Sequence, residues 1–331
     1  MRISARTVMV GLVAALVLAP VAPGPAVQAH AHVTRAPAGG DGIWHPGPGL
    51  RWQYQLTSND RYAATGGINV ELCVPNAAGT RVCPDVFDFD LYLSPDLAGG
   101  RTDVPNKVAV DAVHAKGARA ICYIDAGAIE KDRPDAGRFT AWENDPAHLG
   151  RKGKLVGGPV DGYADERWLN IDNELGQRDF VVSVMAARMD ACVAAGFDGI
   201  EFDLVESYEH PTSETTFVTS ADAQLAFNRA LAAAARDRGL AAGLKNDVQQ
   251  AGELVDAFDF AVNESCLIQK ECGELVDSFG AVGKAVFHVE YDEEWRKGAG
   301  TICAKSAALR FATIRKKSSE TLSDLPYIPC V

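Results

Sequence analysis

The chain has 331 residues, enough for one large domain or two ordinary ones. Hydrophobic residues make up 47% of it, which supports a sizeable core and excludes a globally disordered chain. With 32 basic against 44 acidic residues, the formal net charge is −12, which argues against nucleic acid as a partner and favours a cationic one. A role of this acidity in solubility alone is equally compatible with the composition.

The N-terminal segment has the pattern of a secretory signal peptide. A basic start, MRISAR, precedes the apolar run TVMVGLVAALVLAPVA and the small residues of AVQAHA. This run is too short and wrongly flanked for a membrane span, and no later segment is long and apolar enough for one. We therefore predict a signal peptide over 1–31, a linker over 32–43, and a secreted, extracellular protein whose folded domain covers 44–331.

After the linker, short apolar segments alternate with longer amphipathic or alanine-rich segments. The candidate strands, in chain order, are 50–56, 86–93, 118–124, 167–171, 197–203, 240–246, 258–264 and 284–291. The candidate helices are 106–117, 178–196, 220–239 and 272–283. This alternation predicts a single (β/α)8 TIM barrel, an α/β fold, with a long insertion at 57–85 after the first strand. An open doubly wound sheet is the rival fold, but the first strand is not followed by a Gly-rich phosphate turn.

Eight cysteines fit an oxidising compartment. Spacing suggests three disulfides: Cys73 with Cys83, Cys266 with Cys272, and Cys303 with Cys330. Cys122 and Cys192 are either buried free thiols or a fourth bridge. Zinc-type C-x-x-C spacing is missing, so no metal site is predicted.

Charged residues gather where the candidate strands end. The strand 197–203 carries Glu201 and Asp203 and is followed by Glu206. Corresponding positions of other strands hold Asp90, Asp125, Asp172, Lys245, Asp247, Glu264 and Glu290. In a barrel these ends converge on the face where active sites lie. A single acid there is most often a helix cap, but a cluster of acids costs stability and indicates function.

Paired carboxylates without a metal or thiol nucleophile are typical of glycoside hydrolysis. One carboxylate attacks or activates water, and another, kept protonated, gives its proton to the leaving oxygen. The aromatic residues that could stack on sugar rings are Trp52, Tyr54, Tyr123, Trp168, Tyr208 and Tyr291, although core packing explains each of them equally well. A serine-hydrolase G-x-S-x-G motif is missing, and no cofactor is expected.

Two other interpretations stay open. Lys245 at a strand end could form a Schiff base, as in an aldolase, but neighbouring acids such as Asp247 and Glu264 should raise its pKa and oppose that role. A barrel of this kind could also bind a cationic or amino-sugar polymer without cleaving it.

Several stretches together resemble glycoside hydrolase family 114, the endo-α-1,4-polygalactosaminidases. They are WHPGPGLRWQYQL, FDFDLYL, AICYIDAGAIEKDRPDAGRF, ERWLNID, GFDGIEFD, GLAAGLKNDVQQ, FDFAVNESC and GKAVFHVEY, in family order from residue 44 to 291. The resemblance implies a (β/α)8 barrel with a retaining mechanism. It implies Asp203 as the nucleophile, Glu264 as the general acid/base, and a Cys266–Cys272 bridge bracing the loop that carries Glu264.

The resemblance also implies a substrate, an α-1,4-linked galactosamine-rich polysaccharide, which is cationic and suits an acidic cleft. Residues expected to position it are Trp52, Asp90, Tyr123, Asp125, Asp172, Glu201, Lys245, Asp247 and Glu290. The chain departs from the common family pattern at Asp125, Asn170 and Leu204, where Ser, Asp and Asn are usual. We expect a monomer that binds neither nucleic acid nor membrane.

Overall fold

The computed structural model describes residues 41–75, 79–148, 154–295 and 300–330. The predicted signal peptide, 1–31, and most of the predicted linker, 32–43, lie outside these residues. Within the described part of the chain, no helix combines the length and apolar character needed to cross a bilayer.

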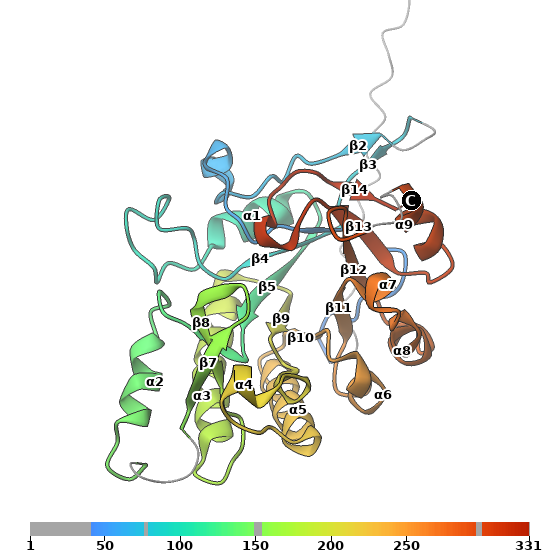
Figure 1. The fold of residues 1–331 in the computed structure, drawn as a ribbon. Helices are drawn as coiled ribbons and strands as arrows, with labels where there is room; N and C mark the ends of the chain where they lie inside the picture. Colours follow the sequence, from blue (N-terminus) through green and yellow to red (C-terminus); the bar gives the residue numbers. More distant parts are fainter. Residues whose placement is uncertain (1–40, 76–78, 149–153, 296–299, 331) are drawn as a thin grey trace, which may run out of the picture. The chain divides into compact units, whose positions relative to one another are not determined.

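The central sheet contains eight neighbouring parallel strands (Figure 1). They are β1 Trp52–Tyr54, β4 Val86–Asp90, β5 Arg119–Asp125, β9 Gly199–Asp203, β10 Ala241–Lys245, β11 Phe260–Glu264, β12 Val286–Tyr291 and β13 Ala312–Lys316. Strands β1 and β13 also approach each other, so the sheet is a nearly closed barrel. The predicted (β/α)8 TIM barrel is confirmed, and nearly all residues of its strands are buried, polar ones such as Asp88 and Glu201 included, as expected for a parallel sheet covered on both faces.

One predicted barrel strand is wrong and another was missed. Residues 167–171 are not in the barrel, because β8 Tyr163–Leu169 pairs antiparallel with β6 Ala128–Glu130 and β7 Val156–Val160 in a separate sheet. The eighth barrel strand is instead β13, and the short strand β14 Ile328–Pro329 pairs antiparallel with it.

The separate three-stranded sheet begins immediately beyond the carboxyl end of β5. Gly127, which precedes β6, donates its N–H to the carbonyl oxygen of Asp203 at 3.1 Å. A Cβ at this position would collide with the carbonyl oxygen of Leu204, so glycine is required for the two backbones to approach. This contact fixes the sheet against the end of β9.

Between β1 and β4, in the predicted insertion 57–85, the chain forms a 3₁₀ turn and a small hairpin. The turn is η1 Asp60–Thr65, and the hairpin pairs β2 Val74–Pro75 with β3 Arg81–Val82. The Cys73–Cys83 disulfide closes the base of this hairpin.

The predicted helices 106–117, 178–196 and 220–239 are confirmed, whereas the predicted helix 272–283 is divided into a short α-helix and a π-helix, and a helix at 136–143 was not predicted. Among the described residues, four helices have eight residues or more. They are α1 Lys107–Ala115, α2 Ala136–Glu143, α3 Gln177–Ala195 and α5 Ala221–Arg236, with shorter helices α4 Thr212–Thr215, α6 Ala251–Leu254, α7 Cys266–Gln269, α8 Cys272–Leu275 and α9 Gly300–Ser306. Short turns complete the set: η2 Ser207–Glu209, η3 Val248–Gln250, the π-helical η4 Val276–Gly280 and η5 Ser319–Thr321. Ser220 caps α5 by accepting the N–H of Ala223, and Gly196 ends α3 with φ of 96°.

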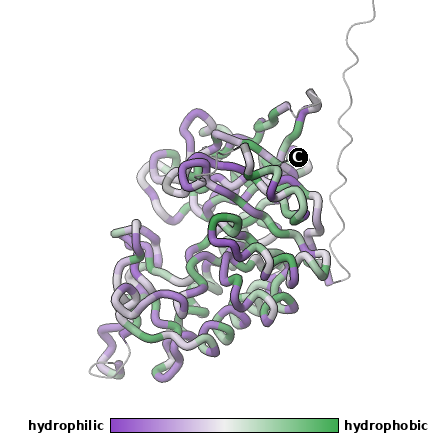
Figure 2. Tube along the Cα trace, turned by 45° about the vertical axis from the view of Figure 1, so that its right-hand side comes forward, coloured by the Kyte–Doolittle hydropathy of each residue, from purple (hydrophilic) through white to green (hydrophobic). Residues whose placement is uncertain are grey.

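Buried apolar side chains form one large cluster that includes residues of the barrel strands and of helices α1, α3 and α5, and a second cluster centred on β1, β11 and β12. Hydrophobic and hydrophilic segments alternate over short distances along the chain (Figure 2). In the second cluster, Trp52 stacks on Tyr54 with ring centroids 5.1 Å apart. The Trp52 side chain is therefore part of the core.

The described residues contain four disulfides. The three pairs suggested by spacing are formed, which confirms Cys73–Cys83, Cys266–Cys272 and Cys303–Cys330. The open question of Cys122 and Cys192 is settled by a fourth bridge, which ties barrel strand β5 to helix α3.

Candidate active site

Three charged residues meet at the carboxyl ends of adjacent strands. Asp203 ends β9, Lys245 ends β10 and Glu264 ends β11. The ammonium nitrogen of Lys245 lies 2.9 Å from Oδ1 of Asp203 and 2.7 Å from Oε2 of Glu264. Parallel pairing of the three strands thus brings residues that are distant in sequence onto one cation.

Two tyrosines hold the remaining oxygens of these carboxylates. The hydroxyl of Tyr123 donates to Oδ2 of Asp203 at 2.8 Å, and the hydroxyl of Tyr291 donates to Oε1 of Glu264. The side chains of Asp203 and Glu264 are 16% and 22% exposed, whereas that of Lys245 is only 2% exposed. The two carboxyl groups therefore face the cavity from fixed orientations, with the lysine behind them.

The electrostatics of this group favour charged forms of Asp203 and Lys245. Burial alone would raise the pKa of Asp203, but the Lys245 ammonium and the hydrogen bond from Tyr123 outweigh it and lower the pKa. Burial would lower the pKa of Lys245, but the carboxylates of Asp203, Glu264 and Glu201 raise it well above its ordinary value. A permanently charged lysine is a poor Schiff-base nucleophile, which argues against the aldolase interpretation.

The backbone takes an uncommon conformation immediately after each of these three residues. Leu204, Asn246 and Ser265 have φ values of 57°, 47° and 62°. Non-glycine residues rarely occupy this left-handed region, and such strain is concentrated at functional sites. This conformation could not be predicted from the sequence, since none of the three positions is a glycine.

Asp203, Lys245 and Glu264, together with Tyr123, line a cavity of about 320 Å³. Its charged lining consists of six acids and two bases: Asp90, Glu130, Glu166, Asp203, Glu206, Glu264, Arg133 and Lys245. The separate sheet contributes Glu130, Tyr163 and Glu166 to the lining, and a second cavity, also about 320 Å³, shares Asp90, Arg133 and Glu166 with it. The acidic excess makes the cavity suitable for a cationic ligand.

Arg133 neutralises one wall of this cavity. It donates two hydrogen bonds to the carboxylate of Asp90, at 2.8 and 2.5 Å, and one to Oε2 of Glu130 at 2.6 Å. Glu166 lies directly opposite Glu130 in the antiparallel register of β6 and β8. Like charges in such a cross-strand pair are destabilising, and burial, followed by the charge of Glu130, raises the pKa of Glu166 to about 7.

This arrangement predicts that ionisation of Glu166 lowers folding stability as the pH rises. The unfolded carboxyl ionises near pH 4.3, whereas the folded one holds its proton to about pH 7, so folding stability falls as the pH rises between these values. Glu166→Gln removes the ionisation. The melting temperature of the variant relative to the native protein is therefore expected to rise between pH 5 and pH 8.

The matched control is Glu253→Gln, which makes the same change at an exposed position in α6. Its melting temperature should differ from that of the native protein by a similar amount at both pH values. A Glu166→Gln difference that is constant with pH would contradict the raised pKa.

Of the other residues expected to position substrate, some line the cavity and some are buried in the interior. Asp90 and Tyr123 line the cavity with the central group. Buried residues with little or no exposed surface are Trp52, Asp125, Glu201, Asp247 and Glu290. Since burial separates these five from solvent, any part they take in binding acts through neighbouring side chains.

Asp172 is placed differently because its strand assignment was wrong. It lies in the connection between β8 and α3, and its N–H is bound by the Asn170 side chain at 2.9 Å. It does not stand at the end of a barrel strand, so the reason for including it in the site is removed.

Sequence reasoning missed Glu130, Arg133, Tyr163 and Glu166 as part of this lining. They come from the separate sheet and the segment following β6, whose place over the barrel depends on tertiary packing. The segment EKDRPDAGRF did carry a signal for a charged part of the site, because its basic residue Arg133 stands between acids.

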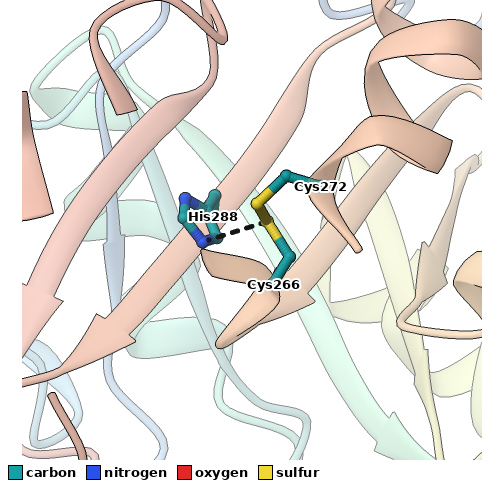
Figure 3. A group of neighbouring side chains, drawn as sticks. All are labelled: Cys266, Cys272 and His288. Carbon is teal, nitrogen blue, oxygen red and sulfur yellow. Dashed lines mark hydrogen bonds between the residues drawn. A yellow bond between two sulfur atoms is a disulfide. The ribbon is translucent and has the colours of Figure 1, made fainter. Parts of the chain in front are cut away.

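Behind Glu264, the Cys266–Cys272 disulfide packs against a buried histidine. Figure 3 shows the ring of His288 directed at this bridge, with Nε2 lying 3.5 Å from Sγ of Cys266. The same nitrogen lies 3.0 Å from Oε1 of Glu290, which also accepts the N–H of Leu267 at 2.7 Å. Cysteine and histidine at this spacing resemble a metal site, but the two sulfurs are bonded to each other, so the group braces the loop after Glu264.

The model of glycoside-hydrolase family GH114 matches residues 33–329, nearly all of the chain. The chain belongs to this family. This GH114 chain is therefore a glycosidase, and the resemblance seen in its sequence motifs is confirmed. No curated protein matches it.

Solved structures agree with the assignment to GH114. Ega3 of Aspergillus fumigatus, solved in complex with galactosamine, has a TM-score of 0.60 and 25% sequence identity, over 83% of this chain and 93% of that chain. The glycoside hydrolase domain of PelA from Pseudomonas aeruginosa has a TM-score of 0.51 and 13% identity, over 84% of this chain and 98% of that chain. At 13% identity, the likeness to PelA shows the shared fold alone.

Proposed function

We propose that this GH114 glycosidase is a secreted monomer that cleaves α-1,4-linked galactosamine-rich polysaccharide at internal linkages with retention of configuration. The observation that carries the proposal is the sharing of one ammonium by Asp203 and Glu264. Because both oxygens lie within 2.9 Å of Nζ of Lys245, they are less than about 6 Å apart, as for the roughly 5–5.5 Å carboxyl separation of retaining enzymes. A separation near 8 Å would have favoured inversion.

In the proposed mechanism, a carboxylate oxygen of Asp203 attacks the anomeric carbon while the bond to the leaving oxygen breaks. Glu264, protonated at this stage, transfers its proton to that oxygen. Glu264 then accepts a proton from water, which attacks the same carbon and releases Asp203. Lys245 and Tyr123 keep Asp203 ionised and oriented, and Tyr291 orients Glu264.

A galactosamine-containing substrate is supported by charge. Six acids against two bases line the cavity, and free amines make such a polymer cationic. Ega3, the similar structure, was solved with galactosamine bound. The adjoining second cavity gives room along the same wall for further sugar units, as endo cleavage requires.

Secretion is supported by two features of the chain. The N-terminal residues have the signal-peptide pattern, and the four disulfides are of a kind that persists in oxidising compartments.

The test uses defined α-1,4 oligomers of galactosamine and of N-acetylgalactosamine. Product masses should show internal cleavage of the galactosamine oligomers, and NMR of the first product should show the α anomer. Release of the β anomer would overturn the retaining mechanism. Failure to cleave either oligomer series, with the protein folded, would overturn the proposed substrate.

A further inference from the structure

The mechanism above gives no role to Glu206, one of the six acids that line the catalytic cavity. Glu206 lies three residues after Asp203 and lines the same cavity, yet the residue is only 9% exposed. Its Oε2 atom is fully buried and, among the residues that the structure describes, has no hydrogen-bond partner. An ionisable group in this state is costly unless something compensates it.

Most other acids of the cavity already have a cationic partner. Lys245 binds Asp203 and Glu264, and Arg133 binds Asp90 and Glu130. Within the described part of the chain, no ion pair is formed by Glu166 or Glu206, and of these two only Glu206 is nearly enclosed. It is therefore the position where an arriving cation gains most.

The loop holds Glu206 firmly in place. On one side, the carbonyl oxygen of Val205 accepts a hydrogen bond from Asn228 at 2.9 Å, and on the other the hydroxyl of Ser207 donates to Gln224 at 3.0 Å. Val205 and Ser207 are themselves buried against α5. The neighbours of Glu206 on both sides are therefore anchored, and its backbone cannot swing outward to bring the carboxyl into solvent.

The charges around Glu206 affect the pKa of its carboxyl group and thereby favour binding of a cation. Burial, then the charge of Asp203, raises the pKa of this carboxyl well above its ordinary value, against the opposing effect of Lys245. Asp247 and Glu209 act in the same direction as Asp203. A bound cation would reverse this balance by favouring the ionised form.

We propose that Glu206 binds the protonated amino group of a galactosamine unit in the catalytic cavity and thereby makes the enzyme select free amino sugars over uncharged ones. The inference rests on the proposed function and names the residue that sets its substrate preference. An N-acetyl group or a hydroxyl in place of the amine carries no charge and would leave Glu206 buried without a cation.

The test compares binding by calorimetry of matched galactosamine and galactose oligomers to the native protein and to Glu206→Gln. The native protein is expected to bind the galactosamine oligomer more tightly, and the variant should lose about 10- to 100-fold of this preference, the strength of a charged hydrogen bond. Affinity for the galactose oligomer should change little. The variant should melt no lower than the native protein, because glutamine removes an uncompensated buried carboxyl.

Glu253→Gln, which makes the same charge change at an exposed position in α6, is the matched control and should keep the native preference. A Glu206→Gln protein that retains the preference, or that loses affinity equally for both oligomers, overturns the inference. Both proteins are compared by calorimetry in the Glu264→Gln background, where the oligomer is bound without turnover, and cleavage is assayed separately with Glu264 intact. A protein that shows the preference but cleaves nothing refutes the proposed function and leaves this inference standing.

Discussion

Asp203→Asn is expected to lower kcat on galactosamine oligomers by roughly a thousandfold or more, because the amide cannot form the covalent glycosyl intermediate. The fold should be kept, since asparagine has nearly the same shape and Lys245 retains Glu264 as a partner at 2.7 Å. Single-turnover and steady-state rates, with circular dichroism and a melting curve on the same preparation, measure both expectations.

The role of Glu264 is separated from that of Asp203 by the choice of leaving group. Glu264→Gln should lose a similar factor on the natural linkage, where the departing oxygen needs a proton. An aryl glycoside whose phenolate leaves unprotonated should restore formation of the intermediate in Glu264→Gln and not in Asp203→Asn. Equal losses of both variants on both substrates would overturn the assignment of nucleophile and acid.

Asp237→Asn is the control for these substitutions. Asp237 is exposed and follows α5, just before β10 begins, so it lies at the opposite end of the barrel from the site. Its kcat and kcat/KM should match those of the native protein within a factor of about two, as for a surface change remote from the cavity. A large loss there would mean that the assay reports folding and not chemistry.

The sequence predicted the barrel because parallel strands leave a strong local signal. Apolar runs such as those of β5 and β9 are buried on both faces, and they are separated by helices with clear end signals. The signal failed at β13, where ATIRK carries two basic residues in five. It also failed at 167–171, because apolar residues at the end of an antiparallel strand look the same as a short barrel strand.

The site was predicted to the extent that it stands on strand ends. Asp203, Lys245 and Glu264 were found because chain order and the barrel geometry place such residues on one face. The acids Glu130 and Glu166 were not found, since they approach the cavity only through the packing of the separate sheet on the end of β9. Glu201 and Glu206 are both buried, but only Glu206 lines the cavity, and this difference is likewise a property of the folded state that cannot be read from the spacing.

Lys245→Met is expected to destabilise the protein by about 3–5 kcal/mol at neutral pH, the cost of removing one partner from a buried charged group. Its ammonium lies 3.8 Å from Oε1 of Glu201 as well as contacting Asp203 and Glu264. Without it, three carboxyls face one another at the end of the barrel. Urea denaturation gives the loss of unfolding free energy, and turnover should fall with it because the geometry of both catalytic carboxyls depends on this lysine.

The pH dependence of this loss decides whether charge is its cause. In the native protein, the pKa of Asp203 lies below its unfolded value of about 3.9, so its contribution to stability is present above that pH and is lost as the pH falls through the folded pKa. In Lys245→Met, burial without the ammonium raises the pKa of Asp203, so its ionisation costs stability as the pH rises. The difference in unfolding free energy between the native protein and Lys245→Met should therefore be largest near pH 7 and shrink towards pH 4. The control is Lys107→Met, which removes an exposed ion pair with Asp111 and should change the unfolding free energy by less than about 0.5 kcal/mol at every pH in this range. A Lys245→Met deficit of the same size at both pH values would show that lost packing, and not the unpaired carboxylates, destabilises the barrel.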